Sequence, residues 1–506
     1  MRKFLPILCF GVALTAAAKN EVYETPNTGT QYTFADLAKI EASGVTKIGT
    51  QCYKVEKDLE IVEKDGLKIE NHDTIMLAKD VQIRLYGGQN DFAPADTALF
   101  CPSEPGIKPK SIHFTGMIRQ EEIRHIRFET IGIRSGGPYG ITVENCTFYE
   151  HLPNGSNYTI GFVGKSVGNI LRNNHFIRTN LSAIGAGSNV AAGVIIEDNI
   201  FEDCSTANRN YPVINEVPSG DNGMVIIRRN KIFGGKRLMP GAISVSNMLT
   251  MTGTNKIVIE DNYMDNSRYG INVLGNLMDI RITGNKIIDC HYENKAANGG
   301  SGITLNSSAK DPKNATKVYV EGNHIEGCLW GITVIGKTIA NLGRLDNPND
   351  STYNPGRNVF KNNGNCGTAP EGETTAFDPS IPYDLYNNTT ETLYAQGNIW
   401  GGTDQSAAEI EKRIFHKTDD PNLGEVIFLP AGSSSGITSV EGEKFTIVNH
   451  GGGMISINGC NGNEVVNVYD LSGKLLFSGS VSEPVAIPQR GIVIVTVNNS
   501  SFKLSI

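Results

Sequence analysis

The stretch Val194-Ile-Ile-Glu-Asp-Asn199-Ile-Phe-Glu-Asp-Cys204 decides the fold of this chain, because related copies recur through the middle of the sequence. Each copy alternates apolar and polar residues around one anchor position. Successive anchors lie 23 to 38 residues apart, at Cys146, Asn174, Asn199, Asn230, Asn262, Asn285 and Asn323, and a late copy surrounds Asn398. Self-similarity with a period in this range is typical of a solenoid, in which each repeat stacks on its neighbours.

A second motif follows the first in several repeats, and it also alternates apolar and polar residues. It occurs as Ala242-Ile-Ser-Val245, Gly270-Ile-Asn-Val273, Gly302-Ile-Thr-Leu305 and Gly331-Ile-Thr-Val334. This alternation is the period of a strand, and neither motif has the length or the 3.6-residue period of a helix. Because two short strands cannot bury their own apolar face, we expect the repeats to stack into a coil with a continuous core. Loops between the strands account for the variable spacing.

The recurring Asn and Cys residues have expected structural roles. Asn tolerates left-handed turns, and stacked amides form ladders from coil to coil. Cys204, Cys290 and Cys328 each lie five residues after their Asn, which predicts small buried core residues. Adjacent coils lie about 4.8 Å apart, so a Cys290–Cys328 disulfide stays open as an alternative. Free thiols are favoured, because equivalent positions in parallel coils point the same way.

These motifs resemble the right-handed parallel β-helix family, also called the pectate-lyase-like superfamily, over roughly residues 59 to 430. The family includes pectate lyases, other polysaccharide lyases, polygalacturonase-like hydrolases and phage tailspikes. The resemblance implies an all-β, right-handed parallel β-helix with capped ends. It does not imply one activity, because fold does not determine function.

Composition and the N-terminus predict an exported protein. Residues 1 to 18 fit a signal peptide, with Arg2 and Lys3 before an apolar stretch and Ala16-Ala-Ala18 as a cleavage site. Its removal changes the net charge from −8 to −10, so nucleic acid is not an expected partner. No apolar run reaches about 18 residues, so no transmembrane segment is predicted. We expect the protein to be extracellular or attached to the outer cell surface.

Both ends of the coil carry cap signals. Residues 19 to 58 are expected to form an N-terminal cap, in which Thr33-Phe-Ala-Asp36 resembles a capping box before a short helix. At the other end, Ser406-Ala-Ala-Glu409 predicts a second capping box. We expect Ala407, Ile410 and Ile414 to share one face of the helix that follows, before a last strand that ends at Pro430.

A separate module follows the coil. Residues 431 to 436 have the composition of a flexible linker, and residues 437 to 506 predict a small β-sandwich in which Asp470-Leu-Ser-Gly473 forms a hairpin turn. The module resembles the C-terminal sorting domain of type IX secretion cargo in Gram-negative bacteria, although Val493 replaces the usual Tyr. The resemblance implies that the secretion machinery is a partner. The alternative is a β-sandwich for adhesion or binding.

The segments between each anchor and the following strand gather aromatic and cationic residues, which stacking should place on one edge of the coil. Rings stack on sugar faces, and cations bind carboxylates or sulfates. The predicted glycan-binding residues are Arg209, Tyr211, Arg237, Arg268, Tyr269, His291, Tyr292 and Trp330, beside outward Asn215, Ser244, Asn272, Thr304 and Thr333. The alternative is an ordinary solvated loop edge.

Catalytic candidates are weaker. A hydrolase needs two carboxylates at a suitable separation. The family resemblance implies that a lyase needs a base, often Lys or Arg, and often calcium. The candidates are Glu216, Asp221, Arg237 and His291, but no family catalytic motif is complete. No metal site or cofactor is identified, although calcium stays possible. The sequence therefore leaves two hypotheses open: a lyase or hydrolase of acidic polysaccharide, or a non-catalytic adhesin or glycan-binding β-helix.

Overall fold

The structure is a computed structural model that describes residues 21–117, 119–187, 190–220, 223–248 and 255–432. In the C-terminal module it describes residues 439–441, 446–451, 454–458, 465–480, 484–488, 491–497 and 500–506. The expected signal peptide and Asp221 lie outside the described residues.

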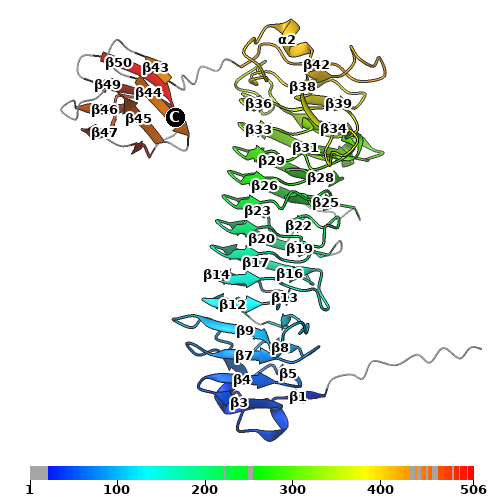
Figure 1. Cartoon of the computed structure of the whole chain (residues 1–506), viewed down its shortest axis with the longest axis vertical. Coiled ribbons are helices and arrows are strands. Elements are labelled where there is room, and N and C mark those ends of the chain that lie inside the picture. Colours follow the sequence, from blue (N-terminus) through cyan, green and yellow to red (C-terminus); the bar gives the residue numbers. More distant parts are fainter. Residues whose placement is uncertain are drawn as a thin grey trace, which may run out of the picture.

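Three long sheets, parallel apart from one antiparallel pair at the N-terminal end, run the length of a right-handed β-helix (Figure 1). The first sheet has 14 strands within the described residues, in the order β1 (Val22–Glu24), β5 (Asp58–Ile61), β8 (Ile83–Tyr86), β10 (Ile112–Thr115), β13 (Ile133–Gly136), β16 (Tyr158–Phe162), β19 (Ser182–Ala186), β22 (Ile214–Glu216), β25 (Ile243–Asn247), β28 (Ile271–Gly275), β31 (Ser301–Ser307), β34 (Trp330–Gly336), β39 (Leu385–Asn388) and β41 (Ile414–Phe415).

The other two long sheets complete each coil. The second sheet orders β11 (Glu121–Arg124), β14 (Ile141–Glu144), β17 (Ser166–Arg172), β20 (Ala192–Glu197), β23 (Val225–Arg228), β26 (Lys256–Glu260), β29 (Asp279–Thr283), β32 (Lys317–Glu321), β35 (Ile339–Asn341), β40 (Leu393–Tyr394) and β42 (Val426–Ile427). The third orders β3 (Val45–Gly49), β4 (Cys52–Val55), β7 (Thr74–Leu77), β9 (Ala98–Pro102), β12 (Ile126–Glu129), β15 (Thr147–Tyr149), β18 (His175–Ile177), β21 (Ile200–Glu202), β24 (Lys231–Phe233), β27 (Tyr263–Asp265), β30 (Lys286–Ile288), β33 (His324–Glu326) and β36 (Val359–Lys361).

Inward side chains from the three sheets fill one apolar interior along the coil axis. The alternating motifs place Ile and Val residues inward on successive strands, as the period of two requires. On strands β9 to β21 of the third sheet the inward residues are aromatic and stack ring on ring, with centroids 4.8 to 5.5 Å apart, at Phe100, Phe128, Phe148, Phe176 and Phe201. The core is therefore continuous from coil to coil, as the repeat predicts.

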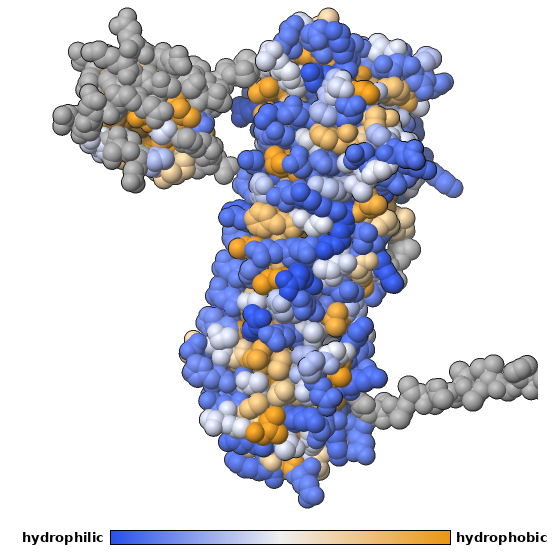
Figure 2. Space-filling model, in the orientation of Figure 1, coloured by the Kyte–Doolittle hydropathy of each residue, from blue (hydrophilic) through white to orange (hydrophobic). Residues whose placement is uncertain are grey.

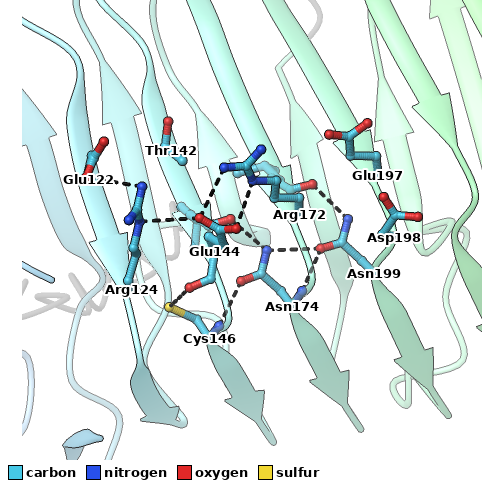
Figure 3. Close-up of polar contacts among 12 residues, drawn as sticks. Glu122, Arg124, Thr142, Glu144, Cys146, Arg172, Asn174, Glu197, Asp198 and Asn199 are labelled. Carbon is cyan, nitrogen blue, oxygen red and sulfur yellow. Dashed lines mark hydrogen bonds and ion pairs between the residues drawn. The ribbon is translucent and has the colours of Figure 1, made fainter. Parts of the chain in front are cut away.

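The predicted Asn ladder is confirmed, and it runs along the turn between the second and third sheets. The buried side-chain oxygen of Asn199 accepts from the backbone N–H and the side-chain amide of Asn174, both at 3.0 Å (Figure 3). The same pair of bonds repeats through Asn230, Asn262, Asn285, Asn323, Asn358 and Asn398. Each Asn thereby satisfies backbone groups that the turn would otherwise leave unpaired.

The expected conformational role of these Asn residues is wrong. The left-handed residue is the one before each ladder Asn, with φ between 52° and 66° at Asn173, Asp198, Arg229, Asp261, Gly284 and Gly322. The ladder Asn is needed for its buried amide. The residue before it supplies the turn conformation and is free to vary in type.

The cysteines of the β-helix are free thiols. Cys204, Cys290 and Cys328 are buried at the turn between the third and first sheets, and the Cys204 thiol donates to the Phe176 carbonyl at 3.5 Å. The prediction of small, unpaired core residues is therefore confirmed for all three.

The two capping boxes differ in outcome. Helix α1 (Phe34–Leu37) has the predicted box, in which Thr33 and Asp36 bond to each other's backbone N–H groups. Helix α2 (Ala407–Glu411) begins after Ser406 without a side-chain cap, so that prediction is wrong. The helix is too short to include Ile414, which belongs to β41 instead. Short 3-10 turns occur at η1 (Glu41–Ser43), η2 (Ala296–Asn298) and η3 (Pro312–Asn314).

The outer face of the second sheet carries a row of alternating charges. In register from β11 to β26, the outward residues are Arg124, Glu144, Arg172, Glu197, Arg228 and Glu260. Glu144 lies between two guanidinium groups, 3.3 Å from Arg124 and 3.0 Å from Arg172 (Figure 3). Opposite charges on neighbouring strands stabilise the register modestly. Because its charges are paired internally, this face is a poor candidate for a charged ligand.

Two small sheets decorate the coil: β2 (Gln31–Thr33) with β6 (Gly66–Lys68), and the antiparallel pair β37 (Gly364–Asn365) and β38 (Phe377–Pro382). The C-terminal module has two four-stranded antiparallel sheets within its described residues. One orders β43 (Ser439–Glu441), β44 (Thr446–Gly451), β45 (Met454–Asn458) and β48 (Val485–Ala486). The other orders β47 (Leu475–Gly479), β46 (Val466–Asp470), β49 (Ile492–Val497) and β50 (Ser500–Ser505).

These two sheets enclose an apolar core of their own, which makes the module a small β-sandwich. The predicted turn at Asp470 joins β46 to β47, where Gly473 has a φ of 84°.

The surface in view is mostly hydrophilic, with apolar residues interspersed over the β-helix (Figure 2). Within the described part of the chain, no helix is long and apolar enough to cross a membrane.

Candidate functional site

A groove of about 800 Å³ lies over the outer face of the first sheet, toward the C-terminal end of the coil. Its floor is a row of outward side chains that the parallel register places one above another. From β22 to β41 the row is Asn215, Ser244, Asn272, Thr304, Thr333, Tyr386 and Phe415. The row spans six strand spacings, or about 29 Å, which suits an extended ligand better than a monosaccharide.

A second outward row runs beside the first, two residues further along each strand. It consists of Ser246, Leu274, Asn306, Ile335 and Asn388. Side chains of the floor also bond to one another. The Asn272 amide donates to the Ser244 hydroxyl at 3.2 Å, and the Ser301 and Thr333 hydroxyls lie 2.9 Å apart. These bonds fix the rotamers of polar groups that a ligand would meet.

One wall of the groove comes from the turn between the third and first sheets. The Arg268 guanidinium lies 2.7 Å from the Glu293 carboxylate, and it donates to the Asn298 carbonyl of η2 at 2.9 Å. The Trp330 indole N–H donates to the Ala296 carbonyl at 2.9 Å, also in η2. Asn365 and Gly367 extend this wall from the β37–β38 hairpin. The loop that follows β30 is therefore held rigidly against the sheet.

Aromatic rings close the C-terminal end of the groove. The Trp330 ring lies 4.6 Å from Tyr383 and 5.0 Å from Tyr386 between centroids, and Tyr386 meets Phe415 edge-on at 5.2 Å. Trp330, Tyr386 and Phe415 all line the groove. Such a cluster offers large, preformed apolar faces beside the polar floor.

Tyr269 lies in the groove but is almost fully buried. Its ring covers the backbone of Gly241, where an added Cβ would approach the ring within 2.0 Å, so no larger residue fits there. Burial raises the pKa of Tyr269 to about 12. The raised pKa favours the protonated phenol, which interacts with Ser244 of the floor.

The structure brings together three of the eight predicted binding residues. Arg268, Tyr269 and Trp330 line the groove. Arg209 is exposed and Tyr211 half-buried, and only their neighbours Asn210 and Pro212 line it.

The other predicted binding residues lie on the same edge but have protein partners. Arg237 forms an ion pair with Asp203. The His291 ring stacks on Phe377 with centroids 4.4 Å apart, and burial lowers its pKa. The Tyr292 hydroxyl points to Asn266, at 3.4 Å. For these residues, the alternative of an ordinary solvated loop edge fits better than a shared binding surface.

Glu216 does not lie beside the groove. It follows the outward Asn215 on β22, so it points inward, in register with the core residue Val245. The side chain is 0% exposed, and among the described residues no side chain donates a hydrogen bond to its carboxylate. Burial raises the pKa of Glu216 to about 8. This corrects its expected position, because strand alternation puts neighbouring residues on opposite faces.

The described lining of the groove contains no Asp, Glu, His or Lys side chain. The described residues also contain no group of three or more His, Cys, Asp or Glu side chains placed to hold a metal ion. Among the described lining residues, the titratable side chains are Arg268, which is paired with Glu293, and the tyrosines. This arrangement can stack and hydrogen-bond a ligand, but it offers no carboxylate pair for acid–base catalysis.

Sequence reasoning missed the aromatic end of the groove. Tyr386 and Phe415 occupy the same register row as the predicted Asn215 and Ser244. Their strands lack the Gly-Ile motif, and residues 337–384 separate β39 from β34, so the repeat was not visible. The alternating Leu385-Tyr386 and Ile414-Phe415 pairs were the available signal.

Comparisons with known proteins were made by sequence and by structure. No family model matches the chain, and no curated protein matches it. Among solved structures, a double mutant of the periplasmic alginate epimerase AlgG is 13% identical, with a TM-score of 0.44, over 79% of this chain and 83% of that chain. The AlgG structure without a named mutation is 12% identical over the same shares, with a TM-score of 0.34.

Proposed function

We propose that this chain is an exported protein and that the groove on its first sheet binds a segment of polysaccharide. The observation that carries this proposal is the in-register row of Asn, Ser and Thr side chains that ends at the rings of Trp330, Tyr386 and Phe415. Amides and hydroxyls match the hydroxyl groups of a sugar chain, and the aromatic rings match the apolar faces of its rings. The length of the row supports a ligand of several sugar units.

The pairing of the arginines at this edge supports binding of a neutral glycan over binding of an acidic one. Arg268, the guanidinium in the groove, already has the Glu293 carboxylate as a partner at 2.7 Å. Arg237, a second predicted cation, is paired with Asp203. A uronate or sulfate would have to compete with these carboxylates. Stacking and hydrogen bonding by the floor do not depend on ligand charge.

Binding without cleavage is the better supported of the two hypotheses. The described lining supplies no carboxylate pair, and Glu216, the nearest predicted acid, lies inside the coil. Burial raises the pKa of Tyr269, which disfavours the phenolate that a base would need. We therefore favour a surface glycan-binding protein over a lyase or hydrolase.

The C-terminal module supports delivery to the cell exterior. It has an apolar core separate from that of the β-helix, so it can act as an independent targeting module. Its sequence resembles type IX sorting domains at the Asp470 turn and at the terminal strand. We propose that it contacts the secretion machinery and that the β-helix meets its glycan outside the outer membrane.

A glycan array tests the proposed binding function, with calorimetry on the hits and with reducing ends and unsaturated products followed in parallel. We expect at least one oligosaccharide to bind without cleavage, and Trp330→Ala to weaken it about tenfold or more, which equals about 1.4 kcal/mol. Tyr149→Ala is the matched control, because Tyr149 is an aromatic residue on the outer face of the third sheet. Equal losses in both variants, or cleavage of the bound sugar, would contradict the proposal.

A further inference from the structure

An apolar stripe crosses the outer face of the second sheet, beside the row of alternating charges. Four neighbouring strands, β17 to β26, each contribute one outward β-branched residue in register: Ile170, Ile195, Ile226 and Val258. These four side chains are half-buried, and their neighbours on each strand point into the core. Thr142 on β14 and Arg281 on β29 bound the apolar stripe. The described lining of the glycan groove includes none of these residues.

The apolar stripe is open to a partner along the edge that carries the Asn ladder. In these coils two residues separate the second sheet from the third, as Asp198 and Asn199 do between β20 and β21. A turn of two residues is too short to fold over the neighbouring face. On the other side of the stripe, Met224 adds an exposed apolar side chain. Figure 1 shows the strands of this face stacked one above another along the coil.

The charge row beside the apolar stripe is complementary to its own reverse. From β11 to β26 its sign changes at every strand, with Arg and Glu in equal numbers (Figure 3). Such a row has no net charge to attract an ion. When it is turned end for end about a point between two strands, however, each Arg lies opposite a Glu. The row therefore matches a second copy of itself in the antiparallel direction.

We propose that the outer face of the second sheet is the interface of an antiparallel homodimer. Its two-fold axis runs parallel to the strands, between β20 and β23, at the middle of the apolar stripe. Ile195 then faces Ile226 of the second copy, and the outer pair of the stripe meets in the same way. The stripe leaves water on both copies at once, because a two-fold interface uses the same patch twice.

The same axis pairs the charges without further adjustment. Glu197 meets Arg228 of the second copy, two strands at the centre of the interface. Arg172 on β17 meets Glu260 on β26, and both side chains are partly exposed. Farther out, Arg124 on β11 meets Glu321 on β32, which continues the row beyond Thr283. These contacts suppress other orientations, because like charges face each other when the register slips by one strand.

The area of this face fits a reversible dimer. From β11 to β32 it spans seven strand spacings, or about 34 Å, and strands of about five residues make it about 16 Å wide. Each copy therefore contributes about 540 Å², and the dimer buries about 1,100 Å². This total lies near the lower end of specific interfaces. We expect dissociation in the micromolar range, with the glycan groove on the first sheet left uncovered.

Sedimentation velocity of the full chain, over a concentration series from micromolar to submillimolar, tests the proposal. We expect a monomer–dimer equilibrium. Ile195→Arg and Ile226→Arg should each raise the dissociation constant tenfold or more, because the two-fold axis buries each added charge twice. Ile288→Arg is the matched control, because Ile288 is a half-buried outward residue on β30 of the third sheet. It should leave the dissociation constant unchanged.

Charge reversal tests the antiparallel orientation. Arg172→Glu and Glu260→Arg each place like charges opposite one another twice in a homodimer, so each variant alone should dimerise at least tenfold more weakly. An equimolar mixture of the two variants restores opposite charges at both places. A fluorescent label on one variant should therefore report a heterodimer about as tight as the native dimer.

Three results would overturn the homodimer. One is a native chain that stays monomeric across the concentration series. Another is a dimer that Ile195→Arg and Ile226→Arg leave intact, which would place the contact elsewhere in the chain. The third is a mixture of the two charge-reversal variants that forms no heterodimer. Far-UV circular dichroism of each variant verifies that the coil stays folded.

Discussion

Replacing one residue of the Asn ladder should destabilise the β-helix by an amount that the bonding pattern sets. Asn285 is buried, and its side-chain amide donates to the Ile259 carbonyl and to Asn323, both at 2.9 Å. Its side-chain oxygen accepts from the backbone N–H of Asn262 at 3.0 Å and from the Asn262 amide at 2.9 Å. Its amide also donates to the Thr283 carbonyl at 3.2 Å. Asn285→Ala removes all five bonds without changing the backbone conformation at the left-handed residue, which is Gly284.

The expected loss follows from the groups that keep no partner. Asn323 still accepts from the Asn285 backbone, and the Asn262 amide still donates to the Ile227 carbonyl. The Thr283 carbonyl keeps the Asp261 N–H as a donor. Two further buried groups lose their side-chain partner: the Asn262 N–H and the Ile259 carbonyl. An unsatisfied buried group costs about 1–3 kcal/mol, so the variant should lose about 2–6 kcal/mol of unfolding free energy. Asn294→Ala in the same coil has an exposed side chain and should change stability by less than about 0.5 kcal/mol.

Denaturant unfolding followed by tryptophan fluorescence measures this loss. The chain has two tryptophans, Trp330 and Trp400, and both belong to the β-helix, so the signal does not report on the C-terminal module. The two variants should have similar denaturant slopes but different midpoints. A loss below about 1 kcal/mol for Asn285→Ala would refute the idea that the ladder amides satisfy the turn. The turn would then be held by strand pairing alone.

Three further predictions follow from other parts of the molecule. Phe176→Ala in the aromatic stack should cost about 3–5 kcal/mol of unfolding free energy, measured by the same fluorescence assay, and a cost near zero would mean that the stack is dispensable. The pKa of Glu216 is raised from 4.5 to about 8, so folding favours the protonated carboxyl group. The free energy of unfolding should therefore fall as pH rises between those values. In a pH series of denaturant midpoints, Glu216→Gln should lack this fall. Deletion of residues 437–506 should leave the β-helix midpoint unchanged, because the two cores are separate, and should abolish surface delivery in cell fractionation; surface delivery of the truncated chain would contradict the sorting role.

The fold was predictable because its determinants repeat. Each ladder amide bonds to the equivalent atom of the neighbouring coil, so Asn recurs at every repeat from Asn174 to Asn323. This recurrence is visible in a single sequence. The left-handed residue before each Asn escaped notice because it varies in type between Asn, Asp, Arg and Gly. The alternating charges of the second sheet were equally hidden. They pair only after the register brings Arg124 next to Glu144, 20 residues away in the chain.

The candidate site was harder to predict, because loop lengths vary while strand register does not. Residues chosen from the loops have partners elsewhere in the protein: Arg237 pairs with Asp203 of the neighbouring turn, and His291 stacks on Phe377 of β38. Residues chosen from the strands, such as Ser244 and Asn272, fell into the groove as expected. The alternation of inward and outward side chains along a strand explains why Glu216 was misplaced. Once Ile214 is assigned inward and Asn215 outward, the next residue must point inward.

The same strand alternation shows which residues of this β-helix a ligand can contact. Each strand of the first sheet presents only alternate side chains to solvent, and parallel register turns these positions into continuous rows. A ligand that lies along the coil therefore meets one residue from each repeat, as Asn215, Ser244, Asn272, Thr304 and Thr333 illustrate. Function at this surface depends on the row as a whole. A single substitution of a small polar residue should weaken binding of a long ligand only slightly, whereas loss of the Trp330 ring removes an aromatic face at the end of the row and should weaken binding more.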